Sequence, residues 1–428
     1  MVQTSLKILL VGSGGREHAL AWKLGQSPLV DHIYVVPGNG GTERMGDSVS
    51  NVSDTAADDY PGLLLLSQRL GVGLVVAGPD QAVVDGIEGY FRGSGIPCFA
   101  PSKEAAEVEG SKAFAKSFME RYGIPTAAYG SFDNYPEAKQ YLESLDHRVV
   151  IKVDGLAAGK GVVLPVDKQD AERALEEIMV HGKFGSAGDS VVIEEYMDGD
   201  EISVLTFSDG KTTRTLPAGQ DHKRAFDGNR GPNTGGMGVY APVPFVSAAD
   251  MGEIERLVLQ PTFRGLEVDG RRFVGMLFTG IMLTSSGPKV IEYNARFGDP
   301  ETQALMLLLK DTDLAQVLLS CTNGSLADAT INVSSDFVCN VTVAAHGYPL
   351  DCTKGGSIAL DSPPKDVQIF HAGTTYVDGR LVVAGGRVFS ISATGSTLQE
   401  AVSTAYAGVK SIWFDGMFYR TDIAARCL

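Results

Sequence analysis

The first hundred residues alternate between short apolar runs and amphipathic segments, and this alternation constrains the fold more than any other feature. The expected strands cover residues 7–11, 33–36, 74–77 and 97–99, and the expected helices cover residues 18–25, 62–70 and 85–92. Short connections between such units predict a parallel, doubly wound α/β sheet with helices on both faces. Sheets of this kind bind ligands at the carboxyl ends of their strands.

Three glycine-bearing loops follow three of these strands. They are Gly12-Ser13-Gly14-Gly15, Pro37-Gly38-Asn39-Gly40 and Gly78-Pro79-Asp80. Each loop alone is typical of a tight turn. Because the carboxyl ends of parallel strands meet at one edge, the three loops together favour a binding rim.

The rim does not match a dinucleotide site. The third position of the G-x-G-x-x-G pattern is Glu17, whose carboxylate would occupy the helix N-terminus that a pyrophosphate needs. No acidic residue follows the second strand to hold a ribose. A smaller ligand with one phosphate and an amine or hydroxyls fits better, with Arg16 and Glu17 offering both signs of charge.

A strand that ends in a lysine marks the middle of the chain. Residues 149–152 end at Lys152, and the loop 154–161 then leads into a second strand at 162–164. Strand–loop–strand is a hairpin, whereas a Walker loop leads into a helix. Such a hairpin can fold over a triphosphate with its backbone N–H groups and two lysines.

Two further segments of the middle region suggest ligand contacts. A strand at 191–197 runs into residues 198–201, where extended backbone can read an adenine edge and a carboxylate can hold ribose hydroxyls. Residues 219–238 are expected to form a long polar loop, which is usually functional or disordered. Its glycines and cationic residues favour phosphate and carboxylate capture, and His222 is expected to be an ordinary hydrogen-bonding residue.

The segment from Lys289 to Glu301 combines three kinds of binding group. Its first half alternates as a strand does, so Glu292, Asn294 and Arg296 are expected on one face. Carboxylate and amide oxygens suit a hard divalent cation, and a guanidinium suits an anion. Pro300 stands where a following helix would begin. Alone, this pattern is typical of a solvated edge strand.

Length and charge bound the remaining choices. A chain of 428 residues suggests about three domains, and a net charge of −16 argues against nucleic-acid or anionic-membrane surfaces. No apolar run reaches the roughly 20 residues of a membrane span, and the N-terminus lacks a signal-peptide pattern. Five scattered cysteines fit reduced thiols in the cytoplasm. Residues after about 335 are expected to form a third unit that packs and closes the cleft without a catalytic constellation.

Together these segments resemble the phosphoribosylamine–glycine ligases, also called glycinamide ribonucleotide synthetases, of the ATP-grasp superfamily. The matching segments are Gly12 to Ala19, Pro37 to Asn39, Gly110 to Phe114, Lys152 to Gly161, Gln220 to Arg224, Gly231 to Gly238, and Val290 to Gln303. One departure is Asp80, where the family usually carries Glu. The resemblance implies an N-terminal α/β substrate domain (1–103), an ATP-grasp domain (104–332) with a lid subdomain (about 123–193), and a small C-terminal α+β domain (333–428).

The resemblance also implies a reaction, in which ATP, glycine and 5-phosphoribosylamine give glycinamide ribonucleotide, ADP and phosphate through a glycyl phosphate. It assigns catalysis to Lys152, Arg296 and Asp299, and a Mg²⁺ or Mn²⁺ ion to Glu292 and Asn294. It assigns ATP contacts to Lys112, Lys152, Gly155, Gly159, Lys160, Gly161, Glu194, Glu195, Tyr196 and Glu201. It assigns phosphoribosylamine to Gly14, Arg16, Glu17, Gly38, Asn39, Gly78, Pro79 and Asp80. It assigns glycine to Asp221, Lys223, Arg224, Arg296 and Asp299.

Two alternatives stay open at this point. Another ATP-grasp carboxylate–amine ligase would share the ATP and metal residues but need a different first domain. A non-catalytic nucleotide-binding protein would have little reason to keep Glu292, Asn294 and Arg296 together. We expect small-molecule substrates, a cytoplasmic monomer or homodimer, and a chain that is either free-standing or one part of a multifunctional purine enzyme.

Overall fold

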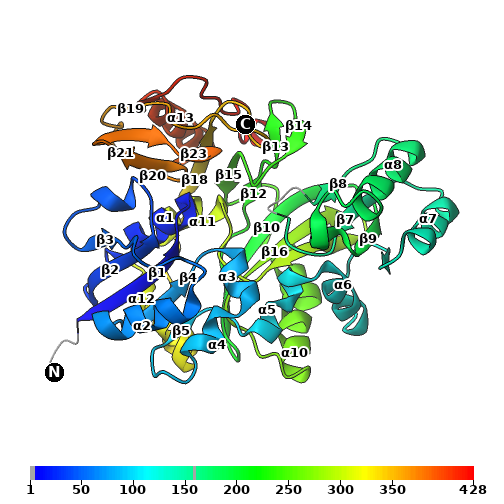
Figure 1. Ribbon diagram of the computed structural model, residues 1–428, viewed down its shortest axis with the longest axis horizontal. Helices are drawn as coiled ribbons and strands as arrows, with labels where there is room; N and C mark the ends of the chain where they lie inside the picture. The colour runs from blue at the N-terminus through cyan, green and yellow to red at the C-terminus, as the bar shows by residue number, and fades with distance from the viewer. Residues whose placement is uncertain (1–4, 158–160) are drawn as a thin grey trace.

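A five-stranded parallel sheet organises the N-terminal part of the computed structural model, which describes residues 5–157 and 161–428 (Figure 1). Its strand order is β3-β2-β1-β4-β5. The strands are β1 (Leu6–Gly12), β2 (Val30–Pro37), β3 (Val49–Asn51), β4 (Leu74–Ala77) and β5 (Cys98–Phe99). Alternate residues of β1 enter two different cores, so both faces of the sheet are covered, as expected. The chain order reverses between β1 and β4, where such sheets bind ligands.

The helices of this domain differ in detail from the expectation. The helix α1 (Gly15–Leu24) begins three residues earlier than predicted, and α2 (Tyr60–Leu70) begins two residues earlier. The helix expected over 85–92 is present as α4 (Ile87–Phe91). A further short helix, α3 (Asp80–Asp85), was not predicted, and it is separated from α4 by Gly86, whose φ of 88° interrupts the helical hydrogen bonding.

An antiparallel sheet of order β11-β10-β16-β17 forms the centre of the molecule. Its strands are β10 (Asp200–Asp209), β11 (Thr213–Thr215), β16 (Val274–Thr284) and β17 (Gly287–Asn294). Around it lie α5 (Lys103–Gly110), α6 (Lys112–Arg121), α9 (Ala248–Ile254), α10 (Gln260–Val268), α11 (Glu301–Leu308) and α12 (Leu314–Asn323). The strand β17 ends at Asn294, so the prediction that it continues through Arg296 is wrong; the backbone bends there and leads into α11.

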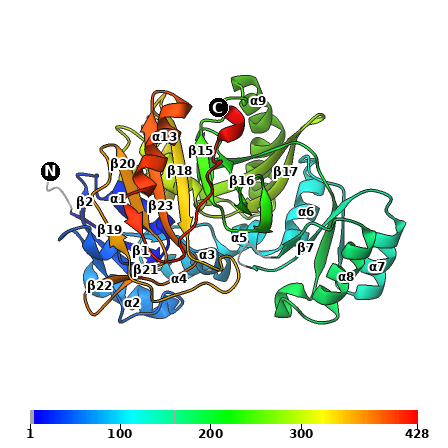
Figure 2. The ribbon, with the colours of Figure 1, turned by 90° about the horizontal axis from the view of Figure 1, so that it is seen from above.

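The lid subdomain stands out to one side of the molecule (Figure 2). Its antiparallel sheet has the order β6-β9-β7-β8 and its own apolar core. The elements are β6 (Tyr129–Phe132), α7 (Tyr135–Ser144), β7 (Val149–Val153), β8 (Val162–Val163), α8 (Lys168–Met179) and β9 (Val191–Glu195). The predicted hairpin is confirmed, because Lys152 of β7 pairs with Val162 of β8.

The C-terminal sheet has the order β12-β15-β18-β23-β20 and includes strands from the middle of the chain. Its strands are β12 (Gln220–Asp221), β15 (Gly238–Ala241), β18 (Phe337–Ala344), β20 (Val367–His371) and β23 (Arg387–Gly395). The remaining elements are β13 (Arg224–Phe226), β14 (Arg230–Asn233), β19 (Ala359–Leu360), β21 (Thr374–Val377), β22 (Arg380–Val383), α13 (Leu398–Val409) and β24 (Ile412–Trp413).

The prediction of a long unstructured loop over 219–238 is therefore wrong. Four short strands occupy it, and β15 satisfies its backbone groups by pairing with β18, about a hundred residues later in the chain. Within the described part of the chain, no helix has the length and apolar character needed to span a membrane.

Candidate active site

A cavity of about 890 Å³ opens where the N-terminal domain, the central sheet, the lid and the C-terminal domain meet. The N-terminal domain contributes Arg16 and Asp80 to its wall, and the lid contributes Lys152 and Glu194. The central sheet contributes Glu292, Asn294 and Arg296, and the C-terminal part contributes Arg387, Arg420 and Asp422. Many of the residues predicted from distant parts of the sequence thus line one continuous cavity. Of the predicted residues that the structure describes, those outside its lining are Gly14, Glu17, Gly38, Asn39, Gly78, Pro79 and Gly155.

On the lid side, a buried carboxylate holds two lysines. Glu194 Oε1 lies 2.9 Å from Lys152 Nζ, and its Oε2 lies 3.0 Å from Lys116 Nζ. Lys152 also donates to the carbonyl of Ile291 at 3.0 Å. Burial lowers the pKa of Lys116 to about 8. Two cations share one carboxylate, so the cluster keeps a positive charge that can attract phosphate.

The loop after Lys152 is tied to the start of α6. Ser111 caps this helix, and its hydroxyl donates to the Asp154 carboxylate at 3.1 Å. The backbone N–H of Ala113 donates to the same carboxylate at 2.7 Å, which places negative charge at the helix N-terminus. Lys112 Nζ donates to the Gly155 carbonyl at 3.3 Å, and burial lowers its pKa. Lys112, Lys152, Gly155 and Gly161 therefore lie together, whereas the predicted Gly159 and Lys160 fall outside the described residues.

The side chain of Glu292 on β17 contacts Lys223, which lies between β12 and β13. Lys223 Nζ lies 2.5 Å from Glu201 and 3.2 Å from Glu292. The Lys223 ammonium lowers the pKa of Glu292 to about 2, with smaller contributions from Lys152 and Lys112. Glu292 is therefore ionised at any physiological pH.

Arg296 and Asp299 each have a partner that the sequence analysis did not identify. Arg296 Nη2 lies 3.1 Å from Glu109 Oε1, and Glu109 Oε2 accepts the Ala295 backbone N–H at 2.7 Å. Asp299 Oδ2 lies 2.8 Å from Arg387 Nη2, and its Oδ1 accepts from Gln303 at 2.7 Å. Although burial opposes it, the charges of Arg387 and Arg16 hold the pKa of Asp299 below its usual value.

The first and third loops of the N-terminal rim meet at the Glu17 side chain. Glu17 Oε2 accepts the Gly14 backbone N–H at 2.6 Å, and its Oε1 accepts from Arg16 Nε at 2.6 Å. A Cβ on Gly12 would lie 2.6 Å from the Glu17 carboxyl carbon, and one on Gly78 would overlap the carboxylate. Glycine is needed at both positions because Glu17 packs between them. Glu17 is buried, so it positions the rim, while Arg16 reaches the cavity wall and donates to the Phe297 carbonyl at 3.2 Å.

Asn39 joins the rim to the C-terminal domain. Its amide nitrogen donates to the carbonyls of Ser13 at 2.9 Å and His371 at 2.8 Å, and its oxygen accepts the Gly41 N–H at 2.8 Å. Gly38 has a φ of 75° and donates to the Gly12 carbonyl at 3.2 Å. The side chain of Asn39 is thus occupied within the protein, and it can contribute to a ligand mainly by fixing the loop.

The other predicted residues lie around the same cavity. Asp80 is the first residue of α3, after Pro79 at the cap position, and lines the cavity. Glu195 pairs with Lys289 at 2.8 Å, and the guanidinium of Arg148 lies over the Tyr196 ring. Arg224 instead donates to the Gly231 carbonyl at 2.7 Å within the β13–β14 hairpin.

His222 behaves as an ordinary hydrogen-bonding residue. Its Nε2 accepts the Ala424 backbone N–H at 3.3 Å, and burial lowers the pKa of its ring to about 4. The ring is therefore neutral at physiological pH, as the sequence analysis expected of a structural residue.

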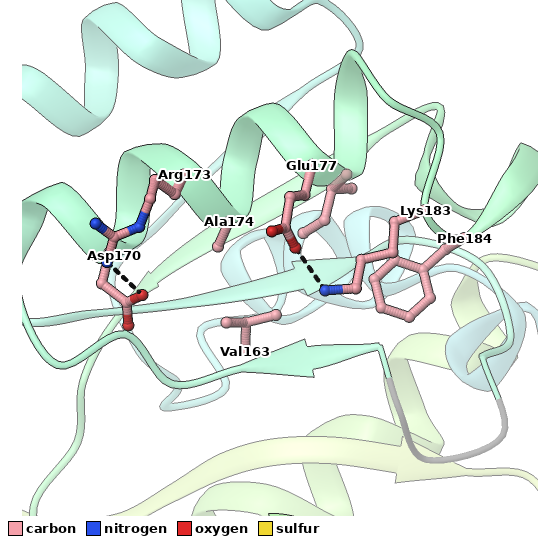
Figure 3. Close-up of a pocket in the computed structure, with 8 residues that line it drawn as sticks. Val163, Asp170, Arg173, Ala174, Glu177, Lys183 and Phe184 are labelled. Carbon is pink, nitrogen blue, oxygen red and sulfur yellow. Dashed lines mark hydrogen bonds and ion pairs between the residues drawn. The ribbon is translucent and has the colours of Figure 1, made fainter. Parts of the chain in front are cut away.

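A second hollow of about 200 Å³ lies on the lid between α8 and β8 (Figure 3). Its charged residues form ion pairs, Arg173 with Asp170 at 3.2 Å and Lys183 with Glu177 at 2.5 Å. Its small volume and paired charges make it a weaker ligand site than the central cavity.

Comparison with known proteins identifies the family. Models of the phosphoribosylglycinamide synthetase N domain, ATP-grasp (A) domain and C domain match residues 6–109, 110–302 and 338–426. The phosphoribosylamine–glycine ligase of Caulobacter vibrioides is 48% identical over 99% of both chains. The chain belongs to the phosphoribosylamine–glycine ligase family. Its fold is mixed α/β and contains the ATP-grasp (A) domain of this family.

Other relatives agree with this assignment. The bifunctional purine biosynthetic protein ADE1 of Schizosaccharomyces pombe is 52% identical over 98% of this chain, which spans 53% of that protein. The chain thus spans about half the length of such bifunctional relatives. The crystal structure of phosphoribosylamine–glycine ligase from Thermotoga maritima matches with a TM-score of 0.83 and 33% identity over 98% of this chain and all of that one. A biotin carboxylase from Campylobacter jejuni shares the fold alone, at a TM-score of 0.72 and 14% identity over 99% of both chains.

ATP-grasp ligases use ATP with a divalent metal, and the donor set of Glu292 and Asn294 in this chain fits such an ion. Glu292 is ionised, and Asn294 uses its amide nitrogen on the Tyr293 carbonyl at 2.8 Å, which leaves its oxygen for a cation. Among the described residues, no cluster of three or more His, Cys, Asp or Glu side chains could hold a metal. Two oxygen ligands completed by substrate phosphates and water are what a small hard cation accepts.

Three residues that contact predicted site residues were not predicted from the sequence: Lys116, Glu109 and Arg387. Glu109 could have been found from the sequence, because it is the one acidic residue on the buried face of α5, beside Ala105, Ala106 and Val108. Buried acids require a cation or a proton, so this position predicts a partner. Arg387 carried no local signal, because it begins an ordinary strand in the C-terminal domain.

Proposed function

We propose that this chain ligates glycine to 5-phosphoribosylamine, with ATP giving ADP and phosphate, through a glycyl phosphate intermediate. The observation that carries the proposal is the single cavity. It joins the phosphate-attracting cluster at Lys152 and Lys112 to the N-terminal rim at Arg16 and Asp80. An activated acid formed at one end can therefore meet an amine held at the other.

Activation of the carboxylate is a phosphoryl transfer, which depends on charge neutralisation and in-line positioning. Lys112 and Lys152 would hold the triphosphate, together with Gly155 and Gly161 of the hairpin. A Mg²⁺ or Mn²⁺ ion on Glu292 and Asn294 would neutralise phosphate charge when bound. The strand end at Glu194 to Tyr196, with Glu201, would hold the nucleoside.

Arg296 would hold the glycine carboxylate. Its guanidinium lies in the cavity wall beside Asn294, and the Glu109 contact fixes its orientation. Its Nε is buried and has no hydrogen-bond partner among the described residues. A planar guanidinium recognises carboxylates and acyl phosphates with more than one hydrogen bond, which a lysine cannot reproduce.

The N-terminal rim would hold the phosphoribosylamine. Arg16 and Asp80 would offer charges toward the sugar. Gly14, Gly38 and Gly78, with Pro79 before α3, would shape the loops around it, because their backbone N–H groups already donate to Glu17 and to the carbonyls of Gly12 and Val11. Glu17 and Asn39 would act by fixing these loops. Closure of the lid would exclude water, because acyl phosphates hydrolyse.

A coupled ADP-release assay tests the proposal, with phosphoribosylamine formed in situ from ribose 5-phosphate and ammonia. ADP release must require both glycine and the amine, and the ligated product must appear in equal amount. Equal turnover with bicarbonate or a bulkier amino acid, or with no amine, would refute it in favour of another ATP-grasp reaction. Nucleotide binding without turnover would indicate a nucleotide-binding protein instead.

A cytoplasmic location belongs to the same proposal, since all five cysteines are free and three of them are buried. A monomer or homodimer stays a prediction, which light scattering on the purified chain would check.

A further inference from the structure

Residues 420–426, the C-terminal segment, form part of the cavity wall, although the C-terminal domain was expected only to pack and to close the cleft. Arg420, Asp422, Ala425 and Arg426 line the cavity, and the side chain of Arg420 is only 2% exposed. Figure 1 shows the C-terminus beside the hairpin of β13 and β14. A buried arginine requires hydrogen-bond partners, and these partners show what the segment holds in place.

The tip of the β13–β14 hairpin is bonded to two consecutive residues of the C-terminal segment. The Asp227 carboxylate accepts the Thr421 backbone N–H at 2.8 Å and the Thr421 hydroxyl at 2.5 Å. The Gly228 N–H donates to the Asp422 carboxylate at 2.8 Å. Because β13 and β14 form a separate two-stranded sheet, which has little stability of its own, these contacts determine where the tip lies.

Arg420 joins the C-terminal segment to the same hairpin. Its Nε and Nη2 lie 2.7 and 2.8 Å from the two carboxylate oxygens of Asp422. This forked pair orients the guanidinium, so its Nη1 donates to Asn229 Oδ1 at 2.9 Å and to the Arg224 carbonyl at 3.2 Å. Although burial opposes it, the hydrogen bond from Arg420 helps to lower the pKa of Asp422 to about 2, so the pair is ionised at physiological pH.

The C-terminal segment contacts both sequence neighbours of Lys223. The backbone N–H of Ala424 donates to His222 Nε2 at 3.3 Å. Ala424 has a φ of 64°, a left-handed conformation that residues other than glycine rarely adopt. On the other side, Arg420 holds the carbonyl of Arg224. The backbone at Lys223 is therefore fixed before and after this residue.

Lys223 carries the effect of these contacts to the predicted metal site. Its Nζ lies 2.5 Å from Glu201 and 3.2 Å from Glu292, and its side chain lines the cavity. We infer that Arg420 and Asp422 are positioning residues for the ligation reaction, because they fix the hairpin next to Lys223. The inference rests on the proposed function and adds to it a role for the end of the C-terminal domain.

A double-mutant cycle tests whether Arg420 acts through Lys223. Arg420→Met keeps the bulk of the side chain and removes its hydrogen bonds, so kcat/KM for ADP release with glycine and the amine should fall about 10- to 100-fold. Lys223→Met should lower the same constant. In the Lys223→Met background, Arg420→Met should have at most about a twofold further effect, because the side chain that it positions is absent.

Controls keep this cycle readable. Arg380→Met, on exposed β22 of the same domain, should leave kcat/KM unchanged in both backgrounds. If Lys223→Met shows no measurable turnover, Lys223→Arg takes its place in the cycle, because it keeps the charge on a side chain of different shape.

Limited digestion with trypsin measures the position of the hairpin without any turnover. Arg230 is exposed beside the tip, and cleavage after it follows the population of hairpins that have left the C-terminal segment. This cleavage should accelerate about 10- to 100-fold in Arg420→Met, whereas cleavage after Arg380 should be unchanged. Asp227→Asn weakens only the exposed contact with Thr421 and serves if Arg420→Met folds poorly. It should show the same pattern with factors of about three to ten.

Unchanged kcat/KM in a folded Arg420→Met variant would overturn the inference, even if cleavage after Arg230 accelerates. Effects of Arg420→Met and Lys223→Met that multiply would also overturn it, because the C-terminal segment would then act by a route that does not include Lys223. A wild type that releases no ADP with glycine and the amine would instead refute the proposed function, while the digestion would still show whether the segment holds the hairpin. The two failures are therefore distinguishable.

Discussion

Replacement of Arg387 by methionine tests whether the C-terminal domain shapes the active site. Arg387 donates to the Asp299 carboxylate at 2.8 Å, to the Asp299 carbonyl at 3.1 Å and to the Gly235 carbonyl at 2.5 Å. It thereby joins the loop before β15 to the loop before α11. Methionine keeps the bulk of the side chain and removes all of these hydrogen bonds.

The expected size of the effect follows from the burial of this pair. Removing one partner of a fully buried ion pair costs about 3–5 kcal/mol, and a hydrogen bond to a charged group contributes about 1.5–3 kcal/mol. The side chains of Arg387 and Asp299 are 21% and 18% exposed, so solvent screens the loss in part. We expect the joined arrangement of the two loops to be weakened by about 2–3 kcal/mol, which lowers its population about 30- to 150-fold.

Steady-state kinetics of Arg387→Met measure this effect. The value of kcat/KM for glycine and for the amine should fall by a factor within that range, while the KM for ATP stays normal because Lys112 and Lys152 lie on other elements. Arg387→Lys keeps the positive charge but loses the forked geometry of the guanidinium. Its kcat/KM for glycine should therefore lie between the values of the wild type and of Arg387→Met. Arg380→Met, on exposed β22 of the same domain, is the matched control and should be normal.

The pH dependence of stability gives an independent check. Asp299 has a lowered pKa in the folded protein, so its contribution to stability is present above its unfolded pKa of about 4 and is lost as the pH falls through the folded value. The gap in thermal midpoint between wild type and Arg387→Met should thus be constant above about pH 4 and narrow below it. A difference in thermal midpoint that does not change with pH would refute the reasoning, and so would wild-type kinetics of the Arg387→Met variant.

Three other substitutions have direct outcomes. Glu292→Ala should abolish ligation and leave the circular dichroism spectrum intact, since it removes the ionised oxygen ligand; normal turnover at saturating magnesium would exclude this role. Arg296→Lys should lower kcat/KM for glycine severely, because a lysine cannot reproduce the contacts to Glu109 and substrate, and near-normal glycine kinetics would contradict it. Lys116→Met should raise the KM for ATP about tenfold with the glycine KM unchanged, because Glu194 then cancels the Lys152 charge; an unchanged ATP titration would count against the shared carboxylate.

Local pattern predicted much of the fold and the site. The apolar runs of β1, β2 and β4 lie within one to three residues of their predicted limits, because strands buried on both faces need continuous apolar sequence. The Lys152 hairpin and the three loops of the rim also follow from neighbouring residues alone. Their meeting at one edge follows from the parallel connectivity of the sheet.

The errors concern interactions across long stretches of chain. Residues 219–238 are rich in glycine and polar residues and resemble a loop, but pairing with β18 makes strands of them. The partners Arg387 and Asp299 are 88 residues apart, and Glu109 and Ala295 are 186 apart. Such pairs form only when the domains pack against each other, so neighbouring residues in the sequence do not predict them.

The cations that line the cavity are paired with carboxylates, in a chain whose net charge is −16. Lys152 pairs with Glu194, and Lys223 pairs with both Glu201 and Glu292. Arg296 pairs with Glu109, and Arg387 pairs with Asp299. These carboxylates orient the cations before any ligand arrives, so little reorganisation accompanies binding. Among the described residues, Asp221 and Glu301 also line the cavity but form no ion pair of this kind. They are exceptions in a cavity whose other carboxylates hold cations in place before a ligand binds.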